Sequence, residues 1–301
     1  MEFIKPNIYI NFMGMRKINL GVSLCLFILS IICMMPFVRG FNFGTEFAGG
    51  TEIQVALPGS VQAQDVRKAL TPLKLAELRI QSISSEKGTE YLIRVPTTNE
   101  SGKDIAQVIE KSLRDTFGKD KVDIRRADMV GAAVSKDIKM KGALSMFYAW
   151  IGIVIYVWIR FEFSFSIGAL VALIHDATIT LGVFALLGKE INLTIVAAVL
   201  TLIGYSTNDT VVVFDRIREN MKKKTGSFDL FTVINESTSQ TLSRTILTSF
   251  TVFLVVVALF FLGGSVIHDF AFAMIIGVII GTYSSIFIAS PIMVMLHREK
   301  K

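Results

Sequence analysis

Six long apolar runs dominate the sequence and restrict the folds that it can adopt. They lie at residues 18–38, 142–159, 163–187, 192–214, 245–262 and 270–296. A helix that crosses a bilayer needs about 20 mostly apolar residues, so each run is a candidate transmembrane helix. None shows the weak alternation of an outer-membrane β-strand. With 52% hydrophobic residues, the sequence predicts an α-helical polytopic membrane protein with six transmembrane helices.

Basic residues gather on one side of these predicted helices. That side carries Lys5, Arg16, Lys17, Arg160, Arg216, Arg218, Lys222, Lys223, Lys224, Arg298, Lys300 and Lys301, whereas the short loops on the other side hold only Lys189. By the positive-inside rule, both termini are cytoplasmic and the long segment 39–140 is extracytoplasmic. A membrane location, with contact to anionic lipids, therefore explains the net charge of +6 without nucleic acid.

Segment 39–140 is predicted to fold as one domain. Period-2 and helical patterns place strands at 51–57, 78–84, 90–95 and 122–129, and helices at 61–70 and 104–117. This βαββαβ order is the ferredoxin-like arrangement. The segment contains no His/Cys cluster and no phosphate-binding glycine loop, so we expect a scaffold or binding domain and no enzyme activity.

The predicted domains follow from these spans. They are a cytoplasmic N-terminal segment (1–17), a first transmembrane helix (18–38), the extracytoplasmic domain (39–140), a five-helix membrane domain (141–296) and a cytoplasmic tail (297–301). Cys25 and Cys33 both fall in the first apolar run, where we expect buried apolar residues and neither a disulfide nor a metal site.

Two short segments connect the domain to the membrane. The sequence FNFGTEFAGG at 41–50 places Glu46, Gly49 and Gly50 where the chain leaves the first helix. Because glycine permits turns and close backbone approach, the spacing favours a tight turn that feeds a strand. Residues 130–141 are polar and lead into the second apolar run, as a mechanical hinge or as an amphipathic lead-in helix.

The fourth apolar run contains the polar residues Tyr205, Ser206, Thr207, Asn208, Asp209 and Thr210. A carboxylate in a membrane helix costs about 3 kcal/mol on insertion scales and by default marks an ion path, a proton relay or a counter-ion site. Asp209 could instead reach water at the cytoplasmic end. Asp215 and Arg216 lie almost two turns nearer that end and fill this role, which favours a function for Asp209.

The third run contains His175 and Asp176. Adjacent residues on a helix point about 100° apart, so one side chain can orient the other, or each can meet a different helix. Intramembrane His and Asp indicate proton handling, and a structural hydrogen-bonded pair is the alternative.

The fifth and sixth runs carry polar and small residues at helical spacing. Arg244 heads a stripe with Thr248 and Thr251, and either snorkels to the interface or faces Asp209 on the neighbouring helix. Such a pair would act as a switch, because protonation of the acid removes its attraction for the arginine. In the sixth run, Ala273, Gly277, Gly281, Ser285 and Ala289 form a small-xxx-small face for close helix packing.

Several enzyme classes are disfavoured by missing motifs. The sequence has no HExxH motif of zinc proteases and no GxxxxGK[ST] motif of ATP-binding loops. Asp176 and Asp209 could supply the two carboxylates of an intramembrane aspartyl protease, but the flanking residues give no support to that reading.

Five sequence blocks carry a resemblance to a known family. They are FGTEFAGGTEI after the first run, LIHDATITLG, IGYSTNDTVVVFDRIREN, SRTILTSFT and GTYSSIFIASP. In order and spacing they resemble the signature blocks of the SecF family of protein-export membrane subunits, in the resistance-nodulation-division superfamily of proton-driven machines. Glu46 departs from the aspartate that is usual in the family.

The resemblance implies one half of a pseudo-symmetric twelve-helix unit in the bacterial cytoplasmic (inner) membrane, whose other half is SecD. It further implies that the proton motive force is used to promote preprotein translocation after the SecYEG channel has been entered, with protons as coupling ion and no cofactor. The proton-pathway acid falls on Asp209 and its partner arginine on Arg244, with Asp176 and His175 as further proton-coupling candidates. Matching motif residues are Glu46, Gly49, Gly50, Gly204, Tyr205, Ser206, Asn208, Thr210, Asp215 and Arg216.

Two other functions stay open at this point. One is a self-contained proton-coupled exporter of lipids or small molecules that acts as a homo-oligomer. The other is a subunit that is purely structural and transduces no energy.

Overall fold

The computed structural model describes residues 9–58, 61–75, 78–85, 88–96, 102–224 and 228–297. Its long helices are α1 (Arg16–Met34), α5 (Ala132–Arg160), α6 (Phe163–Leu187), α7 (Leu193–Lys223), α8 (Leu230–Leu262) and α9 (Gly264–Ser284), which continues through a π-helical segment (Ser285–Ala289) into α10 (Ser290–Leu296). Six helical spans within the described residues are long and apolar enough to cross a membrane. The prediction of a polytopic membrane protein with six such helices is confirmed. The ends of the chain, 1–8 and 298–301, lie outside the described residues.

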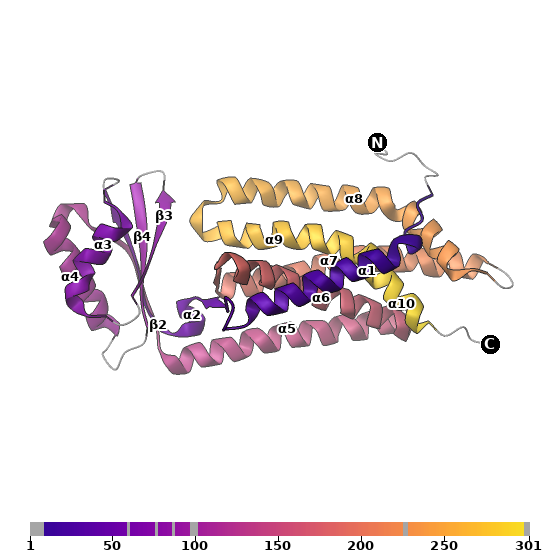
Figure 1. Ribbon diagram of the computed structural model, residues 1–301, viewed down its shortest axis with the longest axis horizontal. Coiled ribbons are helices and arrows are strands. Elements are labelled where there is room, and N and C mark those ends of the chain that lie inside the picture. The colour runs from indigo at the N-terminus through magenta and orange to yellow at the C-terminus, as the bar shows by residue number, and fades with distance from the viewer. Residues whose placement is uncertain are drawn as a thin grey trace.

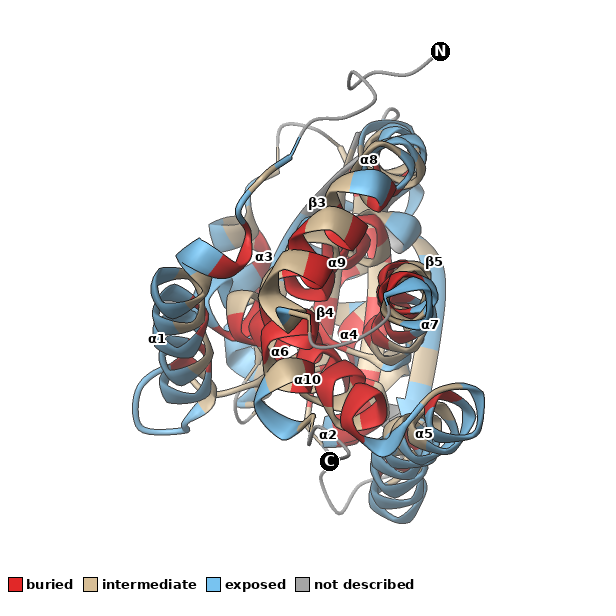
Figure 2. Cartoon of the chain, turned by 90° about the vertical axis from the view of Figure 1, so that its right-hand side faces the viewer, coloured by how far each residue is buried: buried red, intermediate tan, exposed pale blue. Residues whose placement is uncertain are grey.

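Three of the six spans form the centre of the bundle. In their most apolar stretches, α6 and the α9–α10 span each have 56% of residues buried, and α7 has 50%. The corresponding values are 17% for α1, 6% for α5 and 17% for α8. Figure 2 shows the buried residues gathered on the central helices and the exposed ones on the periphery. Because α1 is peripheral, Cys25 is exposed, contrary to the expectation for both cysteines, whereas Cys33 is buried.

The sheet domain lies at one end of the bundle (Figure 1). Its strands are β2 (Gly50–Leu57), β3 (Arg79–Ser85), β4 (Gly88–Val95) and β5 (Asp123–Val130), all antiparallel in the order β3-β4-β2-β5. Helices α3 (Ala63–Leu70) and α4 (Gly102–Phe117) cover the face of the sheet that points away from the bundle. The predicted βαββαβ order of elements is therefore observed.

Alternation along the strands builds the core of this domain. Ile53 and Val55 of β2 and Ile93 of β4 point to the same face and pack against Val66 of α3 and Ile109 of α4. The opposite face of the sheet carries polar residues and points toward the bundle.

The first helix of the domain begins two residues later than its predicted range. Gln62 is the N-cap, and its side chain and that of Asp65 form a capping box with the backbone. This reciprocal pair satisfies amide groups at the helix start, which sets α3 to begin at Ala63.

The polar connection 130–141 is helical. Helix α5 begins at Ala132, directly after β5 ends at Val130, so Gly131 alone separates the strand from a helix that runs to Arg160. Of the two alternatives for this segment, the structure shows a lead-in helix that is continuous with the membrane span.

The glycine block forms more structure than the expected turn. A short strand, β1 (Asn42–Phe43), is followed by a one-turn helix, α2 (Thr45–Ala48), and then by Gly49 and Gly50 with φ angles of 77° and 126°. These angles lie in the region that favours glycine, which explains why both positions need it. Strand β1 pairs in parallel with β6 (Glu190–Ile191), which precedes α7.

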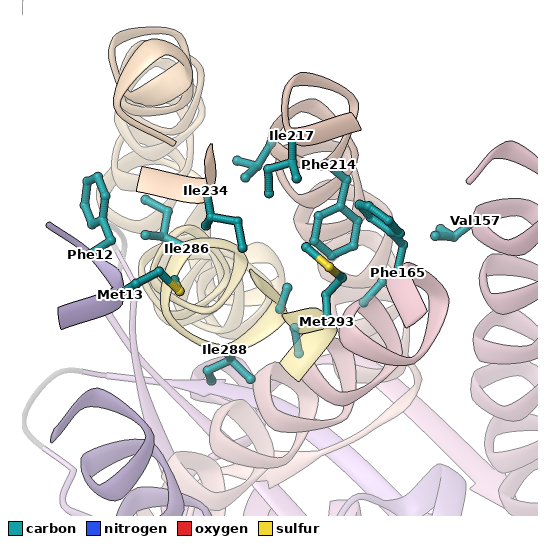
Figure 3. Close-up of a cluster of buried hydrophobic side chains, with 14 residues drawn as sticks. Phe12, Met13, Val157, Phe165, Phe214, Ile217, Ile234, Ile286, Ile288 and Met293 are labelled. Atoms are coloured by element: carbon teal, nitrogen blue, oxygen red, sulfur yellow. The ribbon is translucent and has the colours of Figure 1, made fainter. Parts of the chain in front are cut away.

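The end of the bundle opposite the sheet is held by an apolar cluster (Figure 3). Phe165, Phe214, Ile234, Ile286 and Met293 bring together α6, α7, α8, the π-helical segment and α10. The π-helical segment precedes Pro291, which has no N–H for the helical ladder, and such segments form where that ladder is interrupted.

Helix α6 closely approaches the π-helical segment at Gly168. A Cβ atom there would lie 2.6 Å from the carbonyl oxygen of Ala289 in the π-helical segment. We expect Gly168→Ala to destabilise the bundle by about 1–3 kcal/mol, because backbone must move to make room. Thermal unfolding in detergent, followed by loss of helicity, measures this change.

Gly152→Ala on α5 is the matched control. A Cβ atom at Gly152 meets nothing within 4 Å, so alanine should be neutral or slightly stabilising there. Equal melting temperatures for the two variants would contradict the close approach at Gly168.

Candidate functional site: a polar layer between the membrane helices

Polar side chains from four helices, all buried except the half-buried Thr282, meet inside the bundle. This polar layer consists of His175 and Asp176 of α6, Ser206 and Asp209 of α7, Ser249 of α8, and Thr282 and Ser284 of α9. The layer contains both intramembrane carboxylates that the sequence singled out.

Asp176 is held by donors from three helices. Its Oδ2 atom accepts hydrogen bonds from the hydroxyls of Ser206 and Ser284, each at 2.7 Å, and its Oδ1 atom lies 3.1 Å from Nδ1 of His175. Asp176 is 1% exposed. His175 thus lies against its neighbour rather than meeting a separate helix, which corresponds to the orienting arrangement.

Asp209 has fewer donors. Its Oδ2 atom accepts a hydrogen bond from Ser249 at 3.1 Å, and the hydroxyl of Thr282 lies 2.7 Å from that of Ser249. Asp209 is 2% exposed, so the gain or loss of one proton there changes the charge of a nearly water-free site. Such a change is felt strongly by neighbouring helices, because the surroundings screen it poorly.

The small residues of α9 allow this layer to form. A Cβ atom on Gly281 would lie 3.1 Å from Cβ of Ser206 and 3.6 Å from Oδ2 of Asp176, and one on Gly277 would lie 2.6 Å from Leu202. The hydroxyl of Ser285 donates a hydrogen bond to the carbonyl of Thr282. The small-residue face therefore lies against α7 beside the polar layer.

Arg244 does not pair with Asp209 in this structure. It lies exposed on α8, and no ion pair between the two is found in the part of the chain that the structure describes. The two helices do pack side by side, and Asp209 is reached instead by Ser249, farther along α8. Of the two alternatives for Arg244, the exposed side chain agrees with the one in which it extends to the interface.

One face of α7 is polar yet uncovered. Gly204 and Asn208 lie exposed on it, with Thr201 one turn before Gly204. A Cβ atom on Gly204 would meet nothing within 4 Å. On the same helix Ser206, Asp209 and Thr210 are buried, whereas Tyr205 is half-buried. Helix α7 therefore divides its polar residues between the polar layer and an exposed face.

The two carboxylates accept hydrogen bonds from different sets of hydroxyl groups. Asp176 is bound by Ser206 and Ser284, and Asp209 by Ser249, and the described residues show no hydrogen bond between the two acids. The arrangement suits proton binding next to hydroxyl donors, and gives no support to a two-aspartate protease site.

Glu46 caps the helix that carries Asp209. Its Oε2 atom accepts a hydrogen bond at 2.6 Å from the backbone amide of Leu193, the first residue of α7, and Asn192 accepts from Ile195. A carboxylate at this position stabilises a helix start through its free amides and dipole. Asp209 lies about 24 Å farther along α7 at about 1.5 Å per residue.

The sheet domain contacts the same helix start. Arg94 of β4 pairs with Glu52 of β2 at 2.6 Å and with Glu190 of β6. Burial raises the pKa of Glu190, the Arg94 guanidinium opposes that shift, and Glu52 and Asp269 add to it. Two further motif residues, Asp215 and Arg216, lie at the other end of α7, where Asp215 pairs with Arg160 and Arg216 binds Gln240 and Glu219.

Sequence reasoning missed several members of this arrangement. Ser249 and Ser284 stood inside recognised blocks, and a hydroxyl within an apolar run is a signal for helix-to-helix hydrogen bonding. Arg94 and Glu190 had no such signal, because nothing in their local patterns shows that segments so far apart would meet.

The hydroxyls of Ser206 and Ser284 supply a direct test of the polar layer. We expect Ser206→Ala and Ser284→Ala each to destabilise the bundle by about 1–3 kcal/mol, because Asp176 loses a buried donor. Ser145→Ala is the control, since that hydroxyl is exposed and bonds only its own helix. Melting temperatures in detergent that match the control in both variants would refute the assignment.

Two protein-family models match this chain. The chain matches the family of SecD/SecF protein export membrane proteins, C-terminal part, over residues 104–299, and the SecD/SecF GG motif over residues 36–57. The second match contains the glycine block and Glu46.

Relatives align along nearly the whole chain. The protein translocase subunit SecF of Magnetococcus marinus is 45% identical, covering 98% of this chain and 94% of the relative. That of Desulfurispirillum indicum is 40% identical, covering 95% and 91%.

A solved structure has the same architecture. The crystal structure of SecDF from Thermus thermophilus, a translocon-associated membrane protein, matches with a TM-score of 0.85 and 32% identity over 96% of this chain. The match covers 39% of the SecDF chain, so this chain spans about two-fifths of its length. By family match, by identity over its whole length and by architecture, the chain belongs to the SecF family of protein translocase subunits.

Proposed function

We propose that this chain is an accessory subunit of the Sec translocase that works with SecD and uses the proton motive force to promote preprotein translocation through SecYEG. The observation that carries the proposal is Asp209, a carboxylate that is 2% exposed and lies at membrane depth among hydroxyl donors. Protons are the coupling ion, and no cofactor or covalent catalysis is needed.

Protonation of Asp209 is the proposed coupling event. The acid has one hydroxyl donor from α8, so its charge state biases how α7 and α8 pack. Arg244 lies on the neighbouring helix and is free of any ion pair in the described residues, so it is available to approach Asp209 in a second arrangement. A proton shifts the equilibrium between two arrangements only if it binds them with different affinity. Asp209 would bind a proton less tightly when Arg244 is close than when Ser249 alone is its partner, and this supplies the difference.

His175 and Asp176 complete the proposed proton pathway. The pair lies in the same polar layer and is linked to α7 through Ser206. One charge that crosses a potential of 100 mV supplies about 2.3 kcal/mol, enough to shift a two-state equilibrium roughly fiftyfold.

The exposed face of α7 supports SecD as the partner. Gly204 and Asn208 lie at membrane depth, where a polar side chain facing lipid is costly. A second membrane half that packs on this face would cover Asn208 and fill the open space at Gly204. This chain covers 39% of the SecDF chain that it matches, so the rest of that chain is long enough to hold a second membrane half.

The proposed orientation follows from charge. Arg160 at the end of α5 and Lys222 and Lys223 at the end of α7 lie far from the sheet domain, which supports a cytoplasmic location for that end and an extracytoplasmic one for the domain. The strand order β3-β4-β2-β5 with two helices on one face supports the proposal of a ferredoxin-like domain, whose proposed role is to contact partners outside the membrane.

A self-contained exporter of lipids or small molecules is the second candidate. A homo-oligomer would also cover the exposed face of α7. The identity of the protein that copurifies with the chain separates the two candidates, since only the first requires SecD.

Asp209→Asn tests the coupling role. In membranes that lack the native subunit, export of a secreted precursor is measured with and without a proton motive force. We expect the variant to assemble with SecD but to lose the stimulation, because asparagine cannot bind and release a proton. Arg244→Met should show the same loss.

Glu219→Gln is the control, because Glu219 is on the same helix but pairs with Arg216 and Lys223 at the exposed end. If the proton motive force stimulates export by Asp209→Asn as much as by the wild type, at equal amounts of complex, then Asp209 is a structural polar residue.

Gly204→Leu tests the proposed SecD interface. This chain leaves open space at Gly204, so its own stability should be unchanged, while association with SecD should weaken by about 1–3 kcal/mol, roughly five- to hundredfold. Gly152→Leu on the exposed face of α5 is the matched control. Copurification of SecD at wild-type yield with both variants would place the interface elsewhere.

A further inference from the structure

The sheet domain is joined to the membrane bundle by a well-covered ion pair. The guanidinium of Arg94 lies between the carboxylates of Glu52, on the neighbouring strand, and Glu190, in the loop before α7. The side chains of Arg94 and Glu190 are only 12% and 11% exposed. Because such a pair is largely removed from water, the loss of Arg94 leaves Glu190 as an uncompensated buried charge.

The surrounding residues are shaped for this contact. A Cβ atom on Gly44 would collide with the carboxylate of Glu190, so glycine there makes room for it. The amide of Gly44 also donates to the carbonyl of Ile191 at 2.9 Å. Thr45 donates to Glu52 at 3.0 Å and fixes the second acid beside Arg94.

Two side chains thereby contact the start of α7 from the side of the sheet domain. Arg94 binds Glu190, and Glu46 accepts from the amide of Leu193 three residues later. The helix that begins there is the one that carries Asp209 in the polar layer.

The other ion pairs of the domain are different in kind. Arg126–Asp128 on β5 and Arg114–Glu110 on α4 join residues of the same element and are largely exposed. Among the described residues, Arg94–Glu190 is the ion pair that crosses from the sheet to the membrane bundle. Exposed pairs contribute little to stability, so they also provide natural controls.

We propose that Arg94 and Glu190 form a latch that fixes the sheet domain to the first turn of α7, and that movement of α7 on protonation of Asp209 reaches the domain through this latch. The second half of the statement rests on the proposed function. The first half concerns the position of the domain and is testable without any export assay.

The position of the domain is measured by the distance between two spin labels, with the chain in its complex with SecD in lipid nanodiscs. The native cysteines are replaced by alanine, and labels are placed at the exposed residues Lys111 of α4 and Phe261 of α8. We expect a single narrow distance distribution for the unmodified latch, and a broad one for Arg94→Gln and for Glu190→Gln.

Glu190→Gln is included as a second latch variant because Arg94→Gln could disturb the folding of the sheet domain. It acts from the membrane side and leaves the contact of Arg94 with Glu52 in place. Arg126→Gln on β5, an arginine of the same sheet in an exposed pair, is the control and should keep the narrow distribution. Narrow distributions in both latch variants would overturn the latch.

The same variants are then assayed for proton-motive-force-dependent export at equal amounts of complex. Loss of the stimulation in the latch variants, with Arg126→Gln retaining it, supports transmission through the latch. A broadened distribution with full stimulation would overturn transmission. Absence of stimulation in the wild type would instead overturn the proposed function, and with it the transmission that rests on that function, while the distance measurement still decides the latch.

Discussion

A carboxylate that leaves water must find hydrogen-bond donors, and the membrane bundle is arranged around two that do. Asp176 and Asp209 draw hydroxyls from α7, α8 and α9 to the centre of the molecule. The helices can come close enough only because α9 presents glycine at Gly277 and Gly281. The apolar helices α1, α5 and α8 then surround the centre, which explains why so little of their surface is covered by this chain.

The difference between the two acids is informative. Asp176 has two hydroxyl donors and a histidine, and its surroundings are satisfied from three helices. Asp209 has one hydroxyl donor and lies on the helix that also presents an uncovered polar face. A site with fewer internal partners responds more to what approaches from outside, so the packing around Asp209 depends more on neighbouring groups than the packing around Asp176.

Much of this architecture was predictable from the sequence, for a physical reason. Apolar length fixes the membrane helices, and period-2 alternation fixes strands such as β2 and β4, because both signals are local. Asp209, His175 and Asp176 stood out because charge is expensive in lipid. The short helix α2 and the pairing of β1 with β6 were not predictable, since residues 42–43 and 190–191 carry no local sign of one another. The sequence left open whether Arg244 faces Asp209 or extends to the interface, because the answer depends on how α8 packs against α7.

The strand-to-helix connection at Gly131 has a mechanical consequence. The chain enters the sheet domain through Gly49 and Gly50 and leaves it through Gly131, so both covalent connections are glycine joints. Two joints define a single axis, about which a rigid body can swing. The contact of Arg94 with Glu190 adds a third point away from the chain connections, and three points leave a rigid body no axis of rotation. The domain is therefore held as a fixed extension of the bundle by side-chain contacts away from its chain connections, among them Arg94 with Glu190 and the hydrogen bond from Arg79 of β3 to Asn42 of β1.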